Sequence, residues 1–174
     1  MSASIVSEAF VRAAAPPDAP AWIALRDALW PGSRDDHVRE IAAYFSDPPP
    51  REACFVADAG DGVLVGFAEV RLREYAEDCT SSPVGYLEGI YVVPRRRRTG
   101  VGQALVAAGE RWARDLGCTE MASDRELANE ASGAFHESEG FTETVRLVCY
   151  RKPLGRVAGA GTADEPTSKG RAHG

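Results

Sequence analysis

The fold is decided by residues 84–102, which read VGYLEGIYVVPRRRRTGVG. The first ten of these residues are mostly β-branched, aromatic and aliphatic, which predicts a strand that ends at Pro94. Four arginines follow, and then an amphipathic stretch with two glycines at its start predicts a helix over residues 100–116. Glycines at a helix entrance let a ligand approach the backbone, and N–H groups at the positive helix end bind anions such as phosphate.

The elements around this junction predict one domain with a mixed α/β sheet. Short apolar or alternating runs predict strands, and apolar residues spaced by three and four predict helices. The strands are expected at residues 5–12, 54–57, 64–72, 120–123 and 142–152, and the further helices at 18–29, 33–45 and 127–135. Residues 1–154 form the predicted domain, and residues 155–174, with five Gly and four Ala, form a flexible tail.

Composition narrows the class of function. The 174 residues carry a net charge of −6, which argues against nucleic-acid binding and suits a cationic partner. No apolar run approaches the roughly 20 residues that a membrane span needs, and the N-terminus does not read as a secretory signal. The four cysteines and three histidines are scattered, so we expect free thiols in a reducing cytoplasm and no metal site.

Two motifs resemble those of GNAT acyl-CoA N-acyltransferases. Residues 97–102, RRTGVG, resemble the [QR]-x-x-G-x-[GA] pyrophosphate loop, and Asn129 with Gly140-Phe141 resembles the second motif. The resemblance covers about residues 4–152 and implies a mixed, mostly antiparallel central sheet flanked by about four helices. More narrowly, Leu29-Trp30-Pro31 and residues 86–92 and 118–124 resemble bacterial aminoglycoside 6′-N-acetyltransferases.

That narrower resemblance implies acetyl-CoA as the donor, an aminoglycoside amine as the acceptor, and a homodimer. It also implies two sets of binding residues. The set expected to bind acetyl-CoA is Ile90, Tyr91, Val92, Arg97, Arg98, Thr99, Gly100, Val101, Gly102 and Asn129, and the set expected to bind the aminoglycoside is Trp30, Tyr75, Glu88 and Asp124.

Glu88 interrupts an apolar strand, where a carboxylate is costly unless it is paired or hydrated. Strict alternation would place Glu88 and Ile90 on one face of this strand and Leu87 and Gly89 on the other. We predict that Glu88 binds the acceptor ammonium and acts as its general base, directly or through water; the alternative is a solvent-facing edge residue. Gly89 in mid-strand indicates a bulge, or a glycine needed only for packing.

Three further candidates each have a structural alternative. His136 stands where many GNAT enzymes carry a tyrosine that protonates the departing thiolate, so it is a candidate general acid, or it only forms structural hydrogen bonds. Asp124 follows a strand and either binds the cationic acceptor or caps the next helix. Trp30 either contacts the acceptor or packs in the core. Val145 replaces an acidic residue found in some of the resembling enzymes, which leaves the drug profile open.

The predicted function is direct transfer of acetyl from acetyl-CoA to an aminoglycoside 6′-amine, which confers resistance. The first alternative is a GNAT enzyme for another amine, such as a polyamine, a small metabolite or a protein N-terminus. The second is an acyl-CoA-binding module without catalysis.

Overall fold

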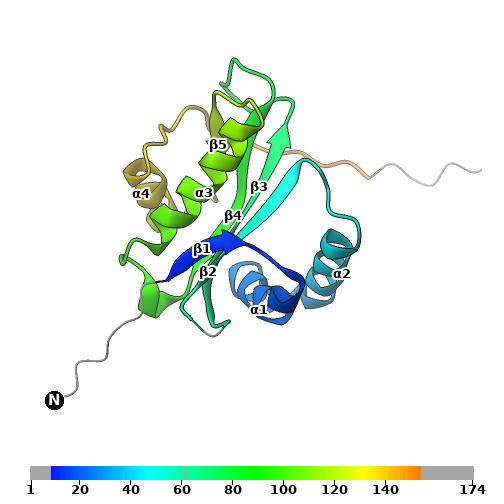
Figure 1. Ribbon diagram of the computed structural model, residues 1–174. Coiled ribbons are helices and arrows are strands. Elements are labelled where there is room, and N and C mark those ends of the chain that lie inside the picture. The colour runs from blue at the N-terminus through cyan, green and yellow to red at the C-terminus, as the bar shows by residue number, and fades with distance from the viewer. Residues whose placement is uncertain (1–8, 61, 154–174) are drawn as a thin grey trace, which may run out of the picture.

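The fold was examined in a computed structural model that describes residues 9–60 and 62–153. In these ranges five strands form one sheet in the order β1-β2-β3-β4-β5 (Figure 1). Neighbouring strands run antiparallel except β4 and β5, which are parallel. The strands are β1 (Phe10–Ala13), β2 (Glu52–Asp58), β3 (Leu64–Arg73), β4 (Val84–Val92) and β5 (Met121–Ser123). The predicted mixed, mostly antiparallel sheet is therefore confirmed.

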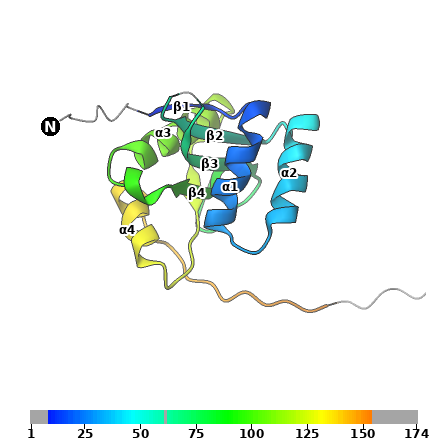
Figure 2. The same ribbon diagram turned by 90° about the horizontal axis from the view of Figure 1, so that it is seen from below.

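Helices cover both faces of the sheet. The four α-helices in the described ranges are α1 (Ala19–Leu29), α2 (Arg34–Ser46), α3 (Val101–Asp115) and α4 (Glu130–Ser138), and 3-10 turns span Pro16–Asp18 and Pro94–Arg96. Figure 2 shows the sheet between α1 and α2 on one side and α3 and α4 on the other. The number of helices agrees with the prediction, and none of the helices in the described part is long and apolar enough to cross a membrane.

Apolar clusters on the two faces hold these layers together. On one face, Leu105 and Val106 of α3 pack in a fully buried cluster with Val70 of β3. On the other, Trp22 of α1 and Ile41 of α2 share a cluster with strand residues that include Phe67. Each buried side chain of this size contributes about 1.5–3 kcal/mol to folding, so the sheet is anchored from both sides.

A bulge in β4 changes the direction of its side chains. Glu69 of β3 lies opposite Gly89, but the next residue, Val70, lies opposite Leu87, so Glu88 is an extra residue in the ladder. The bulge indicated by Gly89 is confirmed. The predicted strict alternation is wrong, because Leu87 and Ile90 both pack on the side of the sheet that α3 covers.

Three other predictions need correction. Residues 142–152 form neither a strand nor a helix, although a final strand was expected there. The sequence Ser33-Arg34-Asp35-Asp36 resembles a capping box and so predicts a capped start of α2, but the Ser33 side chain makes no hydrogen bond there. The first strand spans Phe10–Ala13 and does not include Ala9, whereas residues 5–8 of the predicted strand, together with the predicted tail, lie outside the described residues.

An ion-pair network fastens the edge strand β1 to the rest of the fold. Arg12 donates to Asp18 at 2.6 and 2.8 Å and to Asp58 at 2.9 Å, and both carboxylates are buried. Hydrogen bonds from Arg12 hold the pKa of each of these carboxyl groups below its usual range. Their contribution to stability is therefore present above about pH 4 and is lost as the pH falls through the lowered values.

We predict that Arg12→Gln lowers the free energy of unfolding by about 2–3 kcal/mol at pH 7, because it leaves two buried carboxylates without their cation. The loss should be smaller at pH 3, because the carboxyl groups of the variant, which lack the cation that lowers their pKa values, can then be protonated. Urea unfolding at both pH values measures it. Arg39→Gln, which removes an exposed arginine paired with Asp36, is the control. A loss of equal size at pH 7 and pH 3 would contradict the electrostatic account.

Candidate active site

Strands β4 and β5 separate after a short parallel contact. Their pairing starts at Gly85 and ends where Leu87 lies opposite Ser123, whereas β4 continues to Val92. The Ser123 hydroxyl donates to the Leu87 carbonyl at 3.0 Å, and the His136 Nε2 atom lies 2.9 Å from the Ser123 oxygen. The two strands therefore diverge after Leu87 and Ser123, and this divergence is called the fork here. His136 lies where the strands part, and residues 88–92 of β4 form one side of the fork.

The loop after β4 exposes backbone N–H groups at the start of α3. Arg98 and Gly100 both have positive φ angles, 57° and 85°, which turn the chain sharply into the helix. The N–H of Ala104 donates to the Gly100 carbonyl, so the N–H groups just before Ala104 have no partner within the helix. This is a geometry that binds anions.

The predicted donor residues lie along β4, this loop and the start of α3. Arg97 donates to the Val92 carbonyl at 3.0 Å, and its guanidinium lies 5.7 Å from the centre of the Tyr91 ring. Thr99 donates to a carbonyl within the loop. Ile90 and Val92 pack at the edge of the cluster under α3, and Val101 is buried in it. Arg97 therefore ties the loop back onto β4.

Helix α4 packs against the start of α3, beside this loop. A Cβ atom at Gly102 would lie 2.8 Å from the Phe135 ring, so a glycine is needed for α3 and α4 to approach each other. Asn129 precedes α4, and its side-chain oxygen accepts the N–H of Ser132 at 3.1 Å. Asn129 therefore caps this helix, a structural role that the sequence did not predict.

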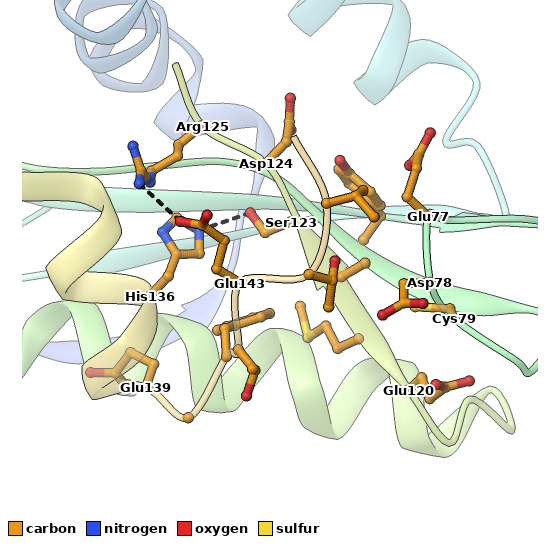
Figure 3. Close-up of a pocket in the computed structure, with 18 of the residues that line it drawn as sticks. Glu77, Asp78, Cys79, Glu120, Ser123, Asp124, Arg125, His136, Glu139 and Glu143 are labelled. Carbon is orange, nitrogen blue, oxygen red and sulfur yellow. Dashed lines mark hydrogen bonds and ion pairs between the residues drawn. The ribbon is translucent and has the colours of Figure 1, made fainter. Parts of the chain in front are cut away.

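Two open cavities lie beside this fork. The larger, of about 920 Å³, is called here the β5 cavity; its lining includes β5, α4 and the segment after Phe141. Figure 3 shows Glu77, Asp78 and Glu120 on one side of it and His136 and Glu143 on the other. The smaller, of about 510 Å³, is called the α1–α2 cavity, and its lining includes Trp30, Glu69 and Glu88.

The predicted acceptor residues are divided between these cavities. Trp30 and Glu88 line the α1–α2 cavity, whereas Asp124 lines the β5 cavity. Tyr75 is 67% exposed, and it lines neither cavity. Three of the four residues thus lie around the bulge of β4, and the fourth lies apart from them.

Glu88 is paired with an arginine whose role was not predicted. Arg73 donates to both Glu88 oxygens, from Nε at 2.9 Å and from Nη2 at 2.6 Å, and its guanidinium lies 3.4 Å from the centre of the Tyr86 ring. Burial and the Asp124 carboxylate raise the pKa of the Tyr86 phenol, which stays neutral. Two carboxylates, a phenol and one arginine therefore meet at the fork.

Trp30 lies over the bulge. A Cβ atom at Gly89 would clash with the Trp30 ring, and the Arg26 guanidinium lies 5.4 Å from the centre of that ring. Arg26 also contacts the Glu69 carboxylate at 3.1 Å, and Trp22 donates to the same carboxylate at 2.9 Å. Burial raises the pKa of Glu69. Packing and charge together thus set the position of Trp30 beside Glu88.

The hydrogen bonds of His136 place its ring. The Ser132 carbonyl lies 2.7 Å from Nδ1, and a carbonyl can only accept, so Nδ1 carries a proton. Nε2 points to the Ser123 hydroxyl at the base of the fork (Figure 3). A proton path from His136 towards the fork therefore passes through Ser123.

Sequence reasoning missed Arg73, Tyr86 and Ser123. Alternation placed Glu69, Arg71 and Arg73 on one face of β3, but it could not tell which side chains of β4 would lie opposite. The bulge decides this, because it turns Glu88 towards Arg73.

Comparison with known proteins defines the class. Residues 19–141 match the acetyltransferase (GNAT) family. The loop before α3 and Asn129 at the start of α4 belong to the motifs on which the sequence resemblance rested. The chain therefore belongs to the GNAT family.

Within the family, the chain is similar to one group of enzymes. It is 49% identical over 150 residues to the aminoglycoside N(6′)-acetyltransferase type 1 of Klebsiella aerogenes, covering 85% of this chain and 99% of that one. The enzyme of the same name from Serratia marcescens is 48% identical, covering 78% and 92%.

Solved structures agree with this grouping. A structure of the aminoglycoside N-acetyltransferase AAC(6′)-Iy in complex with CoA matches with a TM-score of 0.80 and 39% identity, covering 87% of this chain and 99% of that one. A structure of AAC(6′)-Iy with the bisubstrate analog CoA-S-monomethyl-acetylneamine matches with a TM-score of 0.79 and 39% identity, covering 85% and 100%.

We predict that Gly89→Ala lowers the free energy of unfolding by about 1–3 kcal/mol, because the added methyl group must displace the Trp30 ring or the bulge. Trp30→Leu removes the ring that obstructs it. The double variant should therefore be no less stable than Trp30→Leu alone, and urea unfolding of the four proteins measures this coupling. Additive losses would show that Trp30 does not hold the bulge.

Proposed function

We propose that this protein transfers acetyl from acetyl-CoA to the 6′-amine of an aminoglycoside and thereby confers resistance. The observation that carries the proposal is the fork between β4 and β5, with the anion-binding loop on one side and the carboxylates Glu88 and Asp124 on the other. The similarity to aminoglycoside N(6′)-acetyltransferases over most of the chain supports the acceptor.

The donor fits the open arm of β4. Backbone groups of Ile90 to Val92 would hold the pantetheine chain, because β5 no longer occupies that edge of the strand. The loop from Arg97 to Gly102 would bind the pyrophosphate through N–H groups and guanidinium groups. Asn129 would approach the donor only through its amide nitrogen, since its oxygen caps α4.

The acceptor fits the acidic side of the fork. Trp30 and Glu88 would contact the ring that carries the 6′-amine, and Asp124 would pair with another ammonium group. Tyr75 would join them only if the exposed loop that carries it moves, since the ring lines neither cavity. A polycation with several amines suits these separated carboxylates better than a monoamine does.

The reaction is a direct transfer in a ternary complex. Glu88 orients the ammonium and takes its proton, directly or through water. A positioned general base of this kind raises the reaction rate by about 10²–10⁴-fold. The neutral nitrogen attacks the thioester carbonyl and an N–C bond forms. The nitrogen then loses a second proton to water as the C–S bond breaks, which leaves the amide and the thiolate. For His136 to act as the general acid, Nε2 must carry a proton in addition to that on Nδ1; this proton passes to the Ser123 oxygen, and the Ser123 hydroxyl proton passes to the departing thiolate.

The cellular setting follows from the substrates. We place the enzyme in the cytoplasm, where acetyl-CoA is made, and expect it to need no metal, nucleic acid or membrane partner. The four cysteines are free thiols, as a reducing compartment requires.

Release of free CoA tests the proposal. With acetyl-CoA as donor, kanamycin and tobramycin should be acetylated, and NMR of the product should show the acetyl group on the 6′-nitrogen. Turnover of spermidine or of a peptide N-terminus, but of neither antibiotic, would favour an enzyme for another amine. Acetyl-CoA binding without any turnover would favour a non-catalytic module.

We predict that Glu88→Gln lowers kcat/KM for kanamycin at least 100-fold, because it removes both a counter-ion and a base. The Kd for acetyl-CoA should change less than threefold. Asp115→Asn, at the exposed end of α3, removes the same charge and should leave both constants unchanged. Unchanged turnover by Glu88→Gln would remove Glu88 from the mechanism.

We further propose a homodimer formed through the segment after α4. Residues 142–153 make no strand or helix, yet Leu147, Val148 and Tyr150 are 64, 76 and 94% exposed. β5 lies at the edge of the sheet, so a second copy could cover both this strand and these side chains.

Leu147→Asp should weaken the dimer at least tenfold, because it places a charge in the apolar contact. Leu127→Asp is the matched control, since Leu127 is 65% exposed and lies outside the segment. Light scattering after gel filtration measures the mass across a dilution series. Equal masses for wild type and Leu147→Asp at every concentration would contradict this interface.

A further inference from the structure

The Arg73–Glu88 pair lies where the two cavities meet. Arg73 lines the β5 cavity together with Tyr86 and Asp124, whereas Glu88 lines the α1–α2 cavity together with Trp30. The pair joins one wall of each cavity. An acceptor that touches both Trp30 and Asp124 must therefore pass the point that Arg73 occupies.

Arg73 also uses the whole of the Glu88 carboxylate. Its Nε and Nη2 atoms bond to separate oxygens, at 2.9 and 2.6 Å, in the fork-to-fork geometry that suits arginine and carboxylate. The Tyr86 ring, 3.4 Å from the guanidinium, supports the same position. The protein thus places its own cation on the carboxylate that the proposed function assigns to the acceptor ammonium.

We propose that Arg73 competes with the acceptor for Glu88, an inference that rests on the proposed function. A single ammonium group must displace a guanidinium tethered beside Glu88, whose effective concentration is in the millimolar range or above. The competition raises the Kd of every acceptor that must reach Glu88 by the same factor. Only an acceptor with additional contacts, such as a polycation, therefore keeps enough affinity to bind at low concentration.

The surroundings supply what such a displacement needs. An additional carboxylate for a polycation, Asp124, lines the β5 cavity, whereas Glu40 and Glu69 in the α1–α2 cavity already pair with Arg26. Glu77 and Asp78 line the same cavity as Arg73 (Figure 3). Their carboxylates can pair with the Arg73 guanidinium once it leaves Glu88.

The exposure of the pair permits the exchange. The side chains of Arg73 and Glu88 are 36 and 24% exposed, so water screens their attraction. The neighbouring Arg71 reaches Glu88 only at 3.9 Å and pairs with Glu52 at 2.7 Å. Arg73, and not Arg71, is therefore the arginine that occupies the Glu88 carboxylate.

The test compares a polycation with a monoamine in Arg73→Gln. Kanamycin is the polycation, and methyl 6-amino-6-deoxyglucoside presents the same reacting amine with a single charge. We expect KM for both amines to fall at least tenfold in the variant, with their ratio unchanged, because the competing guanidinium is removed for both. Arg73→Lys should give an intermediate KM, and Arg39→Gln should match wild type.

Two results would overturn the inference. If Arg73 merely holds Glu88 in place, KM rises for both amines in Arg73→Gln. If Arg73 does not compete, KM for both amines stays at its wild-type value.

Calorimetric titration with both amines, in the presence of CoA, separates this inference from the proposed function. Wild type that binds kanamycin without turning it over contradicts the proposed reaction alone, and the difference in affinity between wild type and Arg73→Gln still reports on Arg73. Wild type that binds neither amine contradicts the proposed acceptor and, with it, the competition.

Discussion

The parallel contact between β4 and β5 ends at Leu87, and the rest of the site depends on that ending. A sheet that continued to pair would leave no room for a ligand beside β4. The bulge lies at the next residue, Glu88, in the ladder between β3 and β4. It turns the carboxylate away from the α3 side, on which Leu87 and Ile90 both pack. The end of the β4–β5 pairing thus leaves an open backbone edge, and the bulge directs an acidic side chain towards the α1–α2 cavity.

The charge distribution matches this division. The net charge of −6 is an average over two opposed regions. Arginines 95–98 lie in the loop before α3, at the positive end of that helix, where an anionic donor would bind. Carboxylates dominate the two cavities, and Arg73 is the cation held against Glu88. Long-range attraction would bring a polycation to the fork, and it should weaken as salt concentration rises.

Much of this arrangement could be predicted from the sequence. The loop of residues 97–102 and helix α3 carry strong local signals, namely glycines, arginines and regular apolar spacing. The bulge at Gly89 was indicated by a glycine in mid-strand. These features depend on residues that are close together in the sequence, so they can be predicted from a short stretch of it.

The missed features depend on long-range contacts. Arg73 meets Glu88 only because the bulge shifts the register between two strands, and no local pattern records that shift. Asn129 has a motif position that predicted donor binding, yet its oxygen also caps α4. The alternation in residues 142–152 predicted a strand, but a strand needs a partner, and the described chain supplies none.

Hydrogen–deuterium exchange with and without acetyl-CoA tests the central claim most directly, because it reports on individual backbone amides. The open edge of β4 and the loop before α3 should form one donor site. Amides in residues 88–92 and 98–103 should therefore become protected together, while those of β1 and β2 stay unchanged. Protection that appears elsewhere, or in the loop without β4, would contradict the account.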